Sequence, residues 1–459
     1  MTPESMLSDI ERVQEASGLT QRLDASRFTW RHARLYGITI SGQFFDGFDA
    51  TMLGVILPGI AATFGLSKLA AGTLASSAFF GMFIGAVISG FIADRIGRRA
   101  ALMLSISEFS VFSFAAAFAP SYHWLITARA LQGIGLGAEV AIMFAYLAEF
   151  LPIYRRGVYL ASSSLLYQVA GVTSALVALM LVPIFSWRIM FAVGALPLVT
   201  VLLMALYLPE SVRFLLQNNW AAEARAIVDG LSSVSAGAME PPRHAAVVAK
   251  ARHVSVWKIL EGRLLKITLG IWFMNLTSGF VFFAVLTWLP SILISEGFSF
   301  AHSLHYTAAI ALAGAFGAVS VGVSMEAIGR RRTIALFFFC GGSFLVLWGR
   351  QHSDLGVLVF GLLAAFFSFG VAGALNSYTG EVYPTAFRAR GTGWAGGCLR
   401  IGGIIAPPVV GGMLGGGYGA AAVFALLGTI CLVSSIIAIF MTYETAGKSL
   451  EEIASRVSE

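Results

Sequence analysis

The chain has 459 residues, of which 57% are hydrophobic and only 12% are charged, and its formal net charge is +6. Soluble domains carry roughly a quarter charged residues, and a soluble fold of this length cannot hide so many apolar runs. The basic residues lie in short loops beside apolar runs, which is typical of membrane proteins and argues against nucleic-acid binding.

Residues 1–32 form a polar segment of mixed charge before the first apolar run. Leu7, Ile10 and Val13 recur at helical spacing, which indicates a short surface helix. Glu4, Asp9 and Glu11 argue against a cleaved signal peptide, which has a basic start followed by an apolar run. We therefore predict a cytoplasmic N-terminal segment over residues 1–32.

Apolar segments of roughly 20 residues or more, the length that crosses a bilayer, follow in close order. The first set comprises residues 34–62, 70–93, 100–119, 122–148, 157–183 and 187–207. The second set comprises residues 264–294, 302–326, 332–350, 355–380, 390–414 and 418–442. We predict an all-α membrane protein of twelve transmembrane helices, arranged as two six-helix bundles over residues 33–207 and 264–442.

The two bundles share an internal repeat. The charged loop at residues 90–99 returns at residues 322–331, and the same displacement relates a second set of landmarks: Glu149, Pro152 and Arg156 return as Glu381, Pro384 and Arg388. Two independent landmarks at one constant displacement indicate a duplication.

The distribution of basic residues predicts the orientation. One side of the predicted membrane holds most of the loop arginines: Arg95, Arg98, Arg99, Arg155, Arg156, Arg330, Arg331, Arg332, Arg388 and Arg390. The opposite short loops hold little more than Lys68, Arg188 and Arg350. The positive-inside rule makes the arginine-rich side cytoplasmic. We therefore predict a multi-pass protein of the bacterial cytoplasmic (inner) membrane with both termini in the cytoplasm.

Residues 208–263 form the one long loop, and residues 443–459 form a polar tail, both expected in the cytoplasm. One helical face of the loop is apolar and consists of Trp220, Ala224, Ile227, Val228 and Leu231. This pattern predicts an amphipathic helix. Residues 233–249 contain Ser, Gly and a Pro pair, which is typical of a linker.

Four motifs resemble those of the major facilitator superfamily. Residues 90–99 resemble its signature loop between the second and third helices, and residues 129–135 resemble its fourth-helix motif. Residues 209–213 resemble the PESxR motif after the sixth helix, and residues 444–452 resemble the closing motif of its sugar-porter-like branch. The resemblance covers nearly the whole chain and implies two six-helix halves that alternate access to a central site.

Further motifs resemble two groups within this superfamily. Asp46-Gly47-Phe48-Asp49 is similar to the first-helix DGxD motif of aromatic acid:proton symporters. Residues 381–384, 390–393 and 400–403 look more like niacin permeases and related metabolite:proton symporters. Both groups mostly import small carboxylates, so the resemblance implies cargo of that class.

Acidic residues within the spans are candidates for proton coupling. A charged side chain inside a span costs about 2.5–3.5 kcal/mol on insertion scales, and a proton removes the charge of a carboxylate. Asp46 and Asp49 are three residues apart and lie on neighbouring faces of one helix. Repulsion between two partly desolvated carboxylates favours proton binding by at least one of them. The alternative is that one of them pins a helix through a hydrogen bond. Glu139, in the middle of the fourth span, is expected to bind a cation, share the proton or pair with an arginine.

Two arginines within the spans are candidate partners for an anion. Arg400 lies well inside the eleventh span, where a guanidinium can hold a substrate carboxylate in a bidentate pair. The alternative is a permanent internal ion pair. Arg129 either bonds to Asp46 or Asp49 and tunes their titration, or supports packing.

Neutral polar and aromatic residues complete the predicted binding site. The candidates are Tyr167, Gln168, Asn275, Phe282, Asn376, Tyr378 and Trp394. Phe282, Phe283 and Trp288 are expected to clamp a flat ring, since aromatic pairs favour offset or edge contact; packing in the core or against lipid is the alternative. An aromatic cavity with one central cation suits an aromatic carboxylate.

Charged residues in the arginine-rich loops form a predicted gate. The residues are Asp94, Arg98, Glu149 and Arg156 in one half, and Glu326, Arg330, Glu381 and Arg388 in the other. The family resemblance implies a charge network that holds the outward-open state and breaks on opening inward. The alternative is that these charges only set topology and contact lipid headgroups.

No motif in the chain indicates an enzyme, a cofactor, a catalytic set or a metal site. Without a nucleotide site, the driving energy has to come from an ion gradient. We therefore predict a proton-coupled symporter, a monomer in the lipid bilayer, that imports a small organic acid such as nicotinate or a hydroxybenzoate. The alternatives are a sugar, polyol or other metabolite transporter and, more remotely, a non-transporting nutrient sensor.

Overall fold

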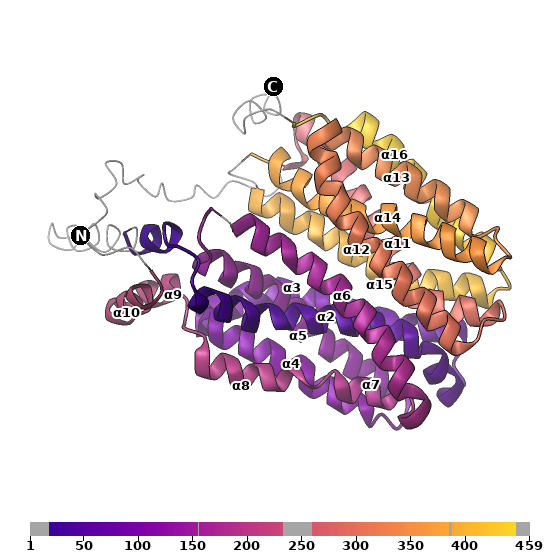
Figure 1. The fold of residues 1–459 in the computed structure, drawn as a ribbon, viewed down its shortest axis with the longest axis horizontal. Coiled ribbons are helices and arrows are strands. Elements are labelled where there is room, and N and C mark those ends of the chain that lie inside the picture. Colours follow the sequence, from indigo (N-terminus) through magenta and orange to yellow (C-terminus); the bar gives the residue numbers. More distant parts are fainter. Residues whose placement is uncertain (1–17, 155, 233–258, 385–387, 447–459) are drawn as a thin grey trace.

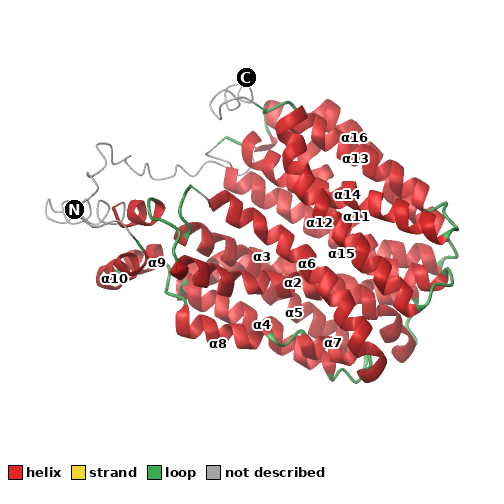
Figure 2. Ribbon diagram, viewed as in Figure 1, coloured by secondary structure: helices red, strands yellow, loops and turns green. Residues whose placement is uncertain are grey.

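The computed structural model describes residues 18–154, 156–232, 259–384 and 388–446. All regular elements of these ranges are helices (Figure 2). The expected surface helix around Leu7, Ile10 and Val13, the linker at residues 233–249 and the tail beyond residue 446 lie outside the described residues.

The described ranges contain twelve segments long and apolar enough to cross a membrane. Those of the first half are α2 (Trp30–Phe64), α3 (Lys68–Ile96), α4 (Arg98–Ala117), α5 (Tyr122–Phe150), α6 (Arg156–Phe185) and the pair α7 (Arg188–Val193) and α8 (Pro197–Tyr207). Those of the second half are α11 (Gly262–Ser295), α12 (Phe300–Ile328), α13 (Arg330–Trp348), α14 (Asp354–Val382), α15 (Arg388–Gly415) and α16 (Ala420–Met441). The predicted fold class is confirmed, and each helix agrees with its predicted apolar segment to within a few residues.

Serine is the N-cap residue of four of these helices. Ser67 and Ser299 cap α3 and α12 by accepting from the backbone N–H three residues on, and Ser121 and Ser353 do the same for α5 and α14. Each pair is separated by the same number of residues as the two charged loops. A serine oxygen satisfies one of the backbone donors that a helix start leaves unpaired. The duplication therefore reaches the helix caps.

Glycine allows the sharp turn in each charged loop. Gly97 and Gly329 both have a φ of +93°, and α4 and α13 begin at the next residue. Glu210 accepts from the backbone N–H of Arg99 at 2.9 Å, and Glu444 accepts from that of Arg330 at 2.7 Å. A carboxylate at a helix N-terminus is stabilised by unpaired N–H groups and by the helix dipole. We call the end of the molecule that carries these two turns the loop end, and the opposite end the far end.

The two halves lie against each other as two groups of helices (Figure 1). The contacts between them are α3 with α15, α6 with α12, and α2 with α11. Near the far end, Lys68 donates to the Leu414 carbonyl at 3.3 Å and Ser76 donates to that of Ile404 at 2.5 Å. A Cβ on Gly72 would collide with the Pro407 backbone. These contacts hold the halves together toward the far end.

Two short helices, α9 (Val212–Gln217) and α10 (Ala221–Leu231), follow the first half at the loop end (Figure 1). The predicted amphipathic helix corresponds to α10, whose Ala224, Val228 and Leu231 are buried. Trp220 differs from the prediction, because it is the N-cap residue and is 52% exposed. The apolar face packs with Leu23 of the N-terminal segment.

Candidate functional site

Buried polar side chains gather between α2 and α5. Asp46 and Asp49 on α2 are 3% and 4% exposed, and Arg129 and Glu139 on α5 are 2% and 0% exposed. Glycine permits the close approach of the helices, because a Cβ on Gly42 would collide with the Glu139 carboxylate. Neither acid on α2 faces lipid, so the site lies inside the helix bundle.

Asp49 is held in an ion pair. One guanidinium nitrogen of Arg129 donates to both carboxylate oxygens of Asp49 at 2.7 and 2.8 Å. Gln132 donates to Asp49 at 2.9 Å and accepts from Arg129 at 2.8 Å. The Arg129 guanidinium also lies 5.7 Å from the centre of the Phe191 ring. Arg129 thus pairs with Asp49 rather than with Asp46.

Asp46 has a different environment from Asp49. Within the described ranges it forms no hydrogen bond or ion pair, although it is almost fully buried. It lies close enough to Asp49 and to Arg400 to interact with both electrostatically. The carboxylate of Asp46 therefore lacks the fixed partners that hold Asp49.

Glu139 is sealed in the protein without a partner. Both of its carboxylate oxygens are buried and have no hydrogen-bond partner among the described residues. Gln43 and Thr39, on the facing helix, each leave a buried side-chain oxygen unpaired as well. An ionised carboxylate in such a place would be strongly destabilised. Nothing among the described residues would neutralise a charge on Glu139.

Arg400 comes from α15, in the other half. Among the described residues its guanidinium forms no ion pair, and its one hydrogen bond is a long contact of 3.5 Å to the Gly396 carbonyl of its own helix. It lies close enough to Asp46 and Tyr167 to interact with them electrostatically. The internal ion pair that the sequence left open is not present in this conformation.

Aromatic rings from both halves adjoin this charge. Phe282 of α11 lies at the centre, 6.3 Å from Tyr167 and 4.7 Å from Phe369 between ring centres. Phe283 lies 5.1 Å from Phe282 and 4.2 Å from Phe79 of the first half. The edge and tilted geometries are those that aromatic pairs favour. These five rings surround the interface between the halves.

Gln168 and Trp288 occupy separate parts of that interface. Gln168 stands at the position in the first half that the repeat relates to Arg400, and its amide lies next to Gly314 of α12. Trp288 donates its ring N–H to the Pro407 carbonyl at 2.9 Å. Trp288 therefore joins α11 to α15 and does not reach the Phe282 cluster.

The asparagines differ in burial. Asn275 is buried on α11, and its amide donates to the Ile271 carbonyl of the same helix at 2.9 Å. Asn376 is exposed on α14. Only Asn275 is enclosed by protein.

Tyr378 and Trp394 have neighbours of their own. The Tyr378 hydroxyl donates to the Tyr443 carbonyl at 3.1 Å and accepts from the Tyr443 N–H at 3.2 Å. Trp394 is 50% exposed, and its ring centre lies 5.6 Å from that of Trp272. Tyr378 thus fastens the segment after α16.

The loop charges pair within each half. Arg98 donates to Glu149 at 2.7 Å, and Ser211 donates to the same carboxylate at 2.7 Å. In the second half Arg330 donates to Glu381 at 3.1 Å, and Thr445 donates at 2.6 Å. Glu149 therefore links Arg98 to the segment after the sixth span, and Glu381 links Arg330 to the segment after the twelfth span.

The other predicted gate residues behave differently. Arg156 pairs with Asp24 of the N-terminal segment and with the Leu151 carbonyl. Asp94 and Glu326 are exposed, and within the described ranges neither forms an ion pair. Arg388, at the start of α15, has a partner of its own.

The sequence analysis missed three residues that bind to the predicted charged residues or to their loops. Gln132 is three residues from Arg129, and that helical spacing is the signal by which it could have been found. Glu210 and Glu444 lie in recognised motifs, but the spacing between them differs slightly from that of the charged loops. A comparison at constant displacement therefore does not pair these two acids.

The twelve spans and a buried, charged centre between two related halves define a multi-pass membrane transporter rather than an enzyme. The family model described as "Major Facilitator Superfamily" matches residues 39–407 and 307–457. The chain belongs to the major facilitator superfamily, as the motifs predicted.

Characterised relatives are similar over most of their length. The niacin transporter NiaP of Acinetobacter baylyi is 31% identical over 432 residues, covering 92% of this chain and 96% of NiaP. A gallate transporter of Pseudomonas putida is 32% identical, covering 84% of this chain and 86% of that protein. The 4-hydroxybenzoate transporter PcaK of Pseudomonas putida is 28% identical, covering 83% and 85%. The predicted resemblance to the aromatic-acid and niacin groups is confirmed.

Solved structures share the fold. The xylose transporter XylE of E. coli, in a partially occluded inward-open conformation, has a TM-score of 0.75 at 17% identity. The match covers 92% of this chain and 100% of XylE. At this identity the similarity concerns the fold alone.

Proposed function

We propose that the protein is a proton-coupled symporter that imports a small aromatic carboxylate by alternating access. The observation that carries the proposal is Arg400, whose guanidinium forms no ion pair among the described residues and lies near Tyr167 of an aromatic cluster and near Asp46, which is likewise unpaired within those residues. Relatives named for the transport of niacin, gallate and 4-hydroxybenzoate support a cargo of this class.

The substrate is held by its charge and by its ring. A planar guanidinium binds a carboxylate through two parallel hydrogen bonds. Phe282, Phe369 and Tyr167 supply ring edges and faces for a flat substrate next to Arg400. Gln168 and Asn275 add neutral hydrogen-bonding groups, whereas the Tyr378 hydroxyl is occupied by the Tyr443 backbone.

The proton is carried by Asp46. An ionised Asp46 attracts Arg400 and so competes with the substrate anion for the same guanidinium. A proton on Asp46 removes that competition, so that the proton and the anion bind together. Asp49 stays paired with Arg129 and keeps that arginine from neutralising Asp46, while the protonated Glu139 lies behind Asp46 as a second proton site.

The arginine-rich loop end is proposed to face the cytoplasm of a bacterial inner membrane, with both termini on that side. The contacts of Lys68 and Ser76 across the halves support a closed far end, and we propose that the site opens toward the loop end in this conformation. Binding at the midplane and rocking of two halves is the general scheme of such transporters. Asp94 and Glu326, exposed here, are proposed to pair when the loop end closes.

Transport in liposomes tests the proton scheme. Uptake of labelled nicotinate and 4-hydroxybenzoate should be faster with an acidic exterior. Asp46→Asn should lose this pH dependence while it keeps exchange of internal for external substrate, because exchange needs no net proton movement. Glu108→Gln, which changes another acid within a span but outside the cluster, should keep the dependence. Gradient-independent net uptake by the unmodified protein, or glucose competing as well as the acids, would contradict the proposal.

Closure of the far end has its own test. A Cβ at Gly54 would collide with the Leu286 carbonyl, so Gly54→Leu should keep the far end open and abolish transport. A cysteine at Ser76, in a background without the native cysteines, should then react with an impermeant maleimide added from the far-end side. Gly37→Leu on the same helix has open space around its Cβ and should leave that cysteine protected. Equal labelling of both variants would refute this closure.

A further inference from the structure

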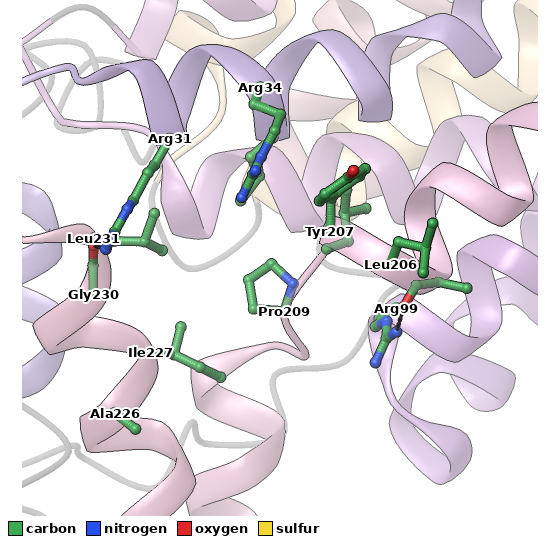
Figure 3. A pocket seen from close by; sticks show the side chains of 13 residues that line it. Arg31, Arg34, Arg99, Leu206, Tyr207, Pro209, Ala226, Ile227, Gly230 and Leu231 are labelled. Atoms are coloured by element: carbon green, nitrogen blue, oxygen red, sulfur yellow. Dashed lines mark hydrogen bonds between the residues drawn. The ribbon is translucent and has the colours of Figure 1, made fainter.

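A pocket of about 450 Å³ lies at the loop end, outside the transport site. It is an open surface pocket lined by the start of α2, the start of α4, the end of α8 and one side of α10. Arg31 and Arg34 come from α2 and Arg99 from α4, on the other side of the opening (Figure 3). Three guanidinium groups from two helices thus line one cavity.

The three arginines keep their positive charge unneutralised. In the part of the chain that the structure describes, none of them forms an ion pair. Arg31 donates to the Gly230 carbonyl, Arg99 donates to the Ala205 carbonyl, and Arg34 lies 4.6 Å over the Tyr207 ring. The Nε of Arg99 is buried and has no hydrogen-bond partner. Backbone carbonyls and a ring orient these groups without cancelling their charge.

The nearby acids are engaged elsewhere. Glu210 accepts from the backbone N–H of Arg99 and of Ser211, at 2.9 and 2.8 Å. Asp229 pairs with Arg22 at 2.7 Å. Neither acid is among the residues that line the pocket.

The rim of the pocket is apolar and lies where a membrane span ends. The span Arg188–Tyr207 finishes at the pocket, and Leu206 and Tyr207 are 72% and 45% exposed. Ile227 of the amphipathic α10 lines the opposite wall (Figure 3). The ligand therefore carries a negative charge at one end and apolar chains at the other.

We propose that this pocket binds the phosphate headgroup of an anionic phospholipid, with the acyl chains along Leu206 and the outer face of α8. Arginine forks match phosphate oxygens, and basic clusters beside a span attract anionic lipid. A soluble phosphate would satisfy the three cations equally but would leave the apolar rim unused.

The test uses the full chain purified in detergent and measures its thermal midpoint against added lipid. Phosphatidylglycerol should raise the midpoint in a saturable way, whereas phosphatidylcholine with the same acyl chains and inorganic phosphate should not. Arg34→Gln breaks no hydrogen bond and should weaken the apparent affinity about fivefold. The triple variant Arg31→Gln, Arg34→Gln and Arg99→Gln should abolish the shift.

A matched triple variant controls for net charge. Arg95, Arg213 and Arg332 are exposed at the same end of the molecule and do not line the pocket. Their replacement by Gln should leave the lipid-induced shift unchanged. Equal shifts with both lipids, an equal shift with inorganic phosphate, or an unchanged apparent affinity of Arg34→Gln for phosphatidylglycerol would each overturn the proposal.

Discussion

Arg400→Gln is expected to lower kcat/KM for uptake of an aromatic carboxylate by about 100-fold. A hydrogen bond to a charged group contributes roughly 1.5–3 kcal/mol, and 2.7 kcal/mol corresponds to about 100-fold. Glutamine keeps a donor but loses both the charge and the paired geometry. Arg400→Lys should fall between, since a lysine supplies the charge without the planar fork.

The measurement is initial uptake of labelled 4-hydroxybenzoate into liposomes across a range of substrate concentrations. Arg350→Gln, an exposed arginine after α13 at the far end, serves as the control and should behave as the unmodified protein. The neutral amide nicotinamide should compete poorly with nicotinate for the unmodified protein, and Arg400→Gln should lose most of this discrimination. Undiminished uptake by Arg400→Gln would exclude Arg400 as the anion site.

Asp49→Leu is expected to destabilise the folded protein by about 3–5 kcal/mol, because it leaves the buried guanidinium of Arg129 without its anion. Arg129 is 2% exposed and takes its charged partner from Asp49 alone among the described residues. Water cannot replace that partner. Combining Asp49→Leu with Arg129→Met removes both charges and should restore most of the stability, since a buried ion pair replaced by apolar groups is often close to neutral.

The measurement is thermal unfolding in detergent of the unmodified protein, Asp49→Leu, Arg129→Met and the double variant. This double-mutant cycle gives the coupling free energy between Asp49 and Arg129. Asp46→Leu is the matched control, as it removes a carboxylate one helical turn away that has no hydrogen bond to lose. It should change the melting temperature far less than Asp49→Leu does. If Asp49→Leu and Asp46→Leu lowered the melting temperature equally, the ion pair between Asp49 and Arg129 would not explain the loss of stability.

Much of this architecture could be predicted from the amino-acid sequence. The twelve spans follow from the length of the apolar runs, since a helix needs about 20 residues to cross the hydrocarbon core. The twin loops at residues 90–99 and 322–331 revealed the duplication, and Gly97 and Gly329 mark the two turns that require a positive φ. The candidates Asp46, Asp49, Arg129 and Arg400 stood out because charge within an apolar span is costly.

What the sequence by itself determined is thus the number and position of the apolar spans, the repeat and the small set of charged residues inside the spans. Only the tertiary structure decided which of those charges are paired: Asp49 pairs with Arg129, whereas among the described residues neither Asp46 nor Arg400 forms an ion pair. Helical spacing places Asp46 and Asp49 on neighbouring faces of one helix, but the rotation of that helix against α5 selects the acid that reaches Arg129. That rotation follows from the packing of α2 against α5 and α6 and against α11 of the other half, whose residues lie far away in the sequence.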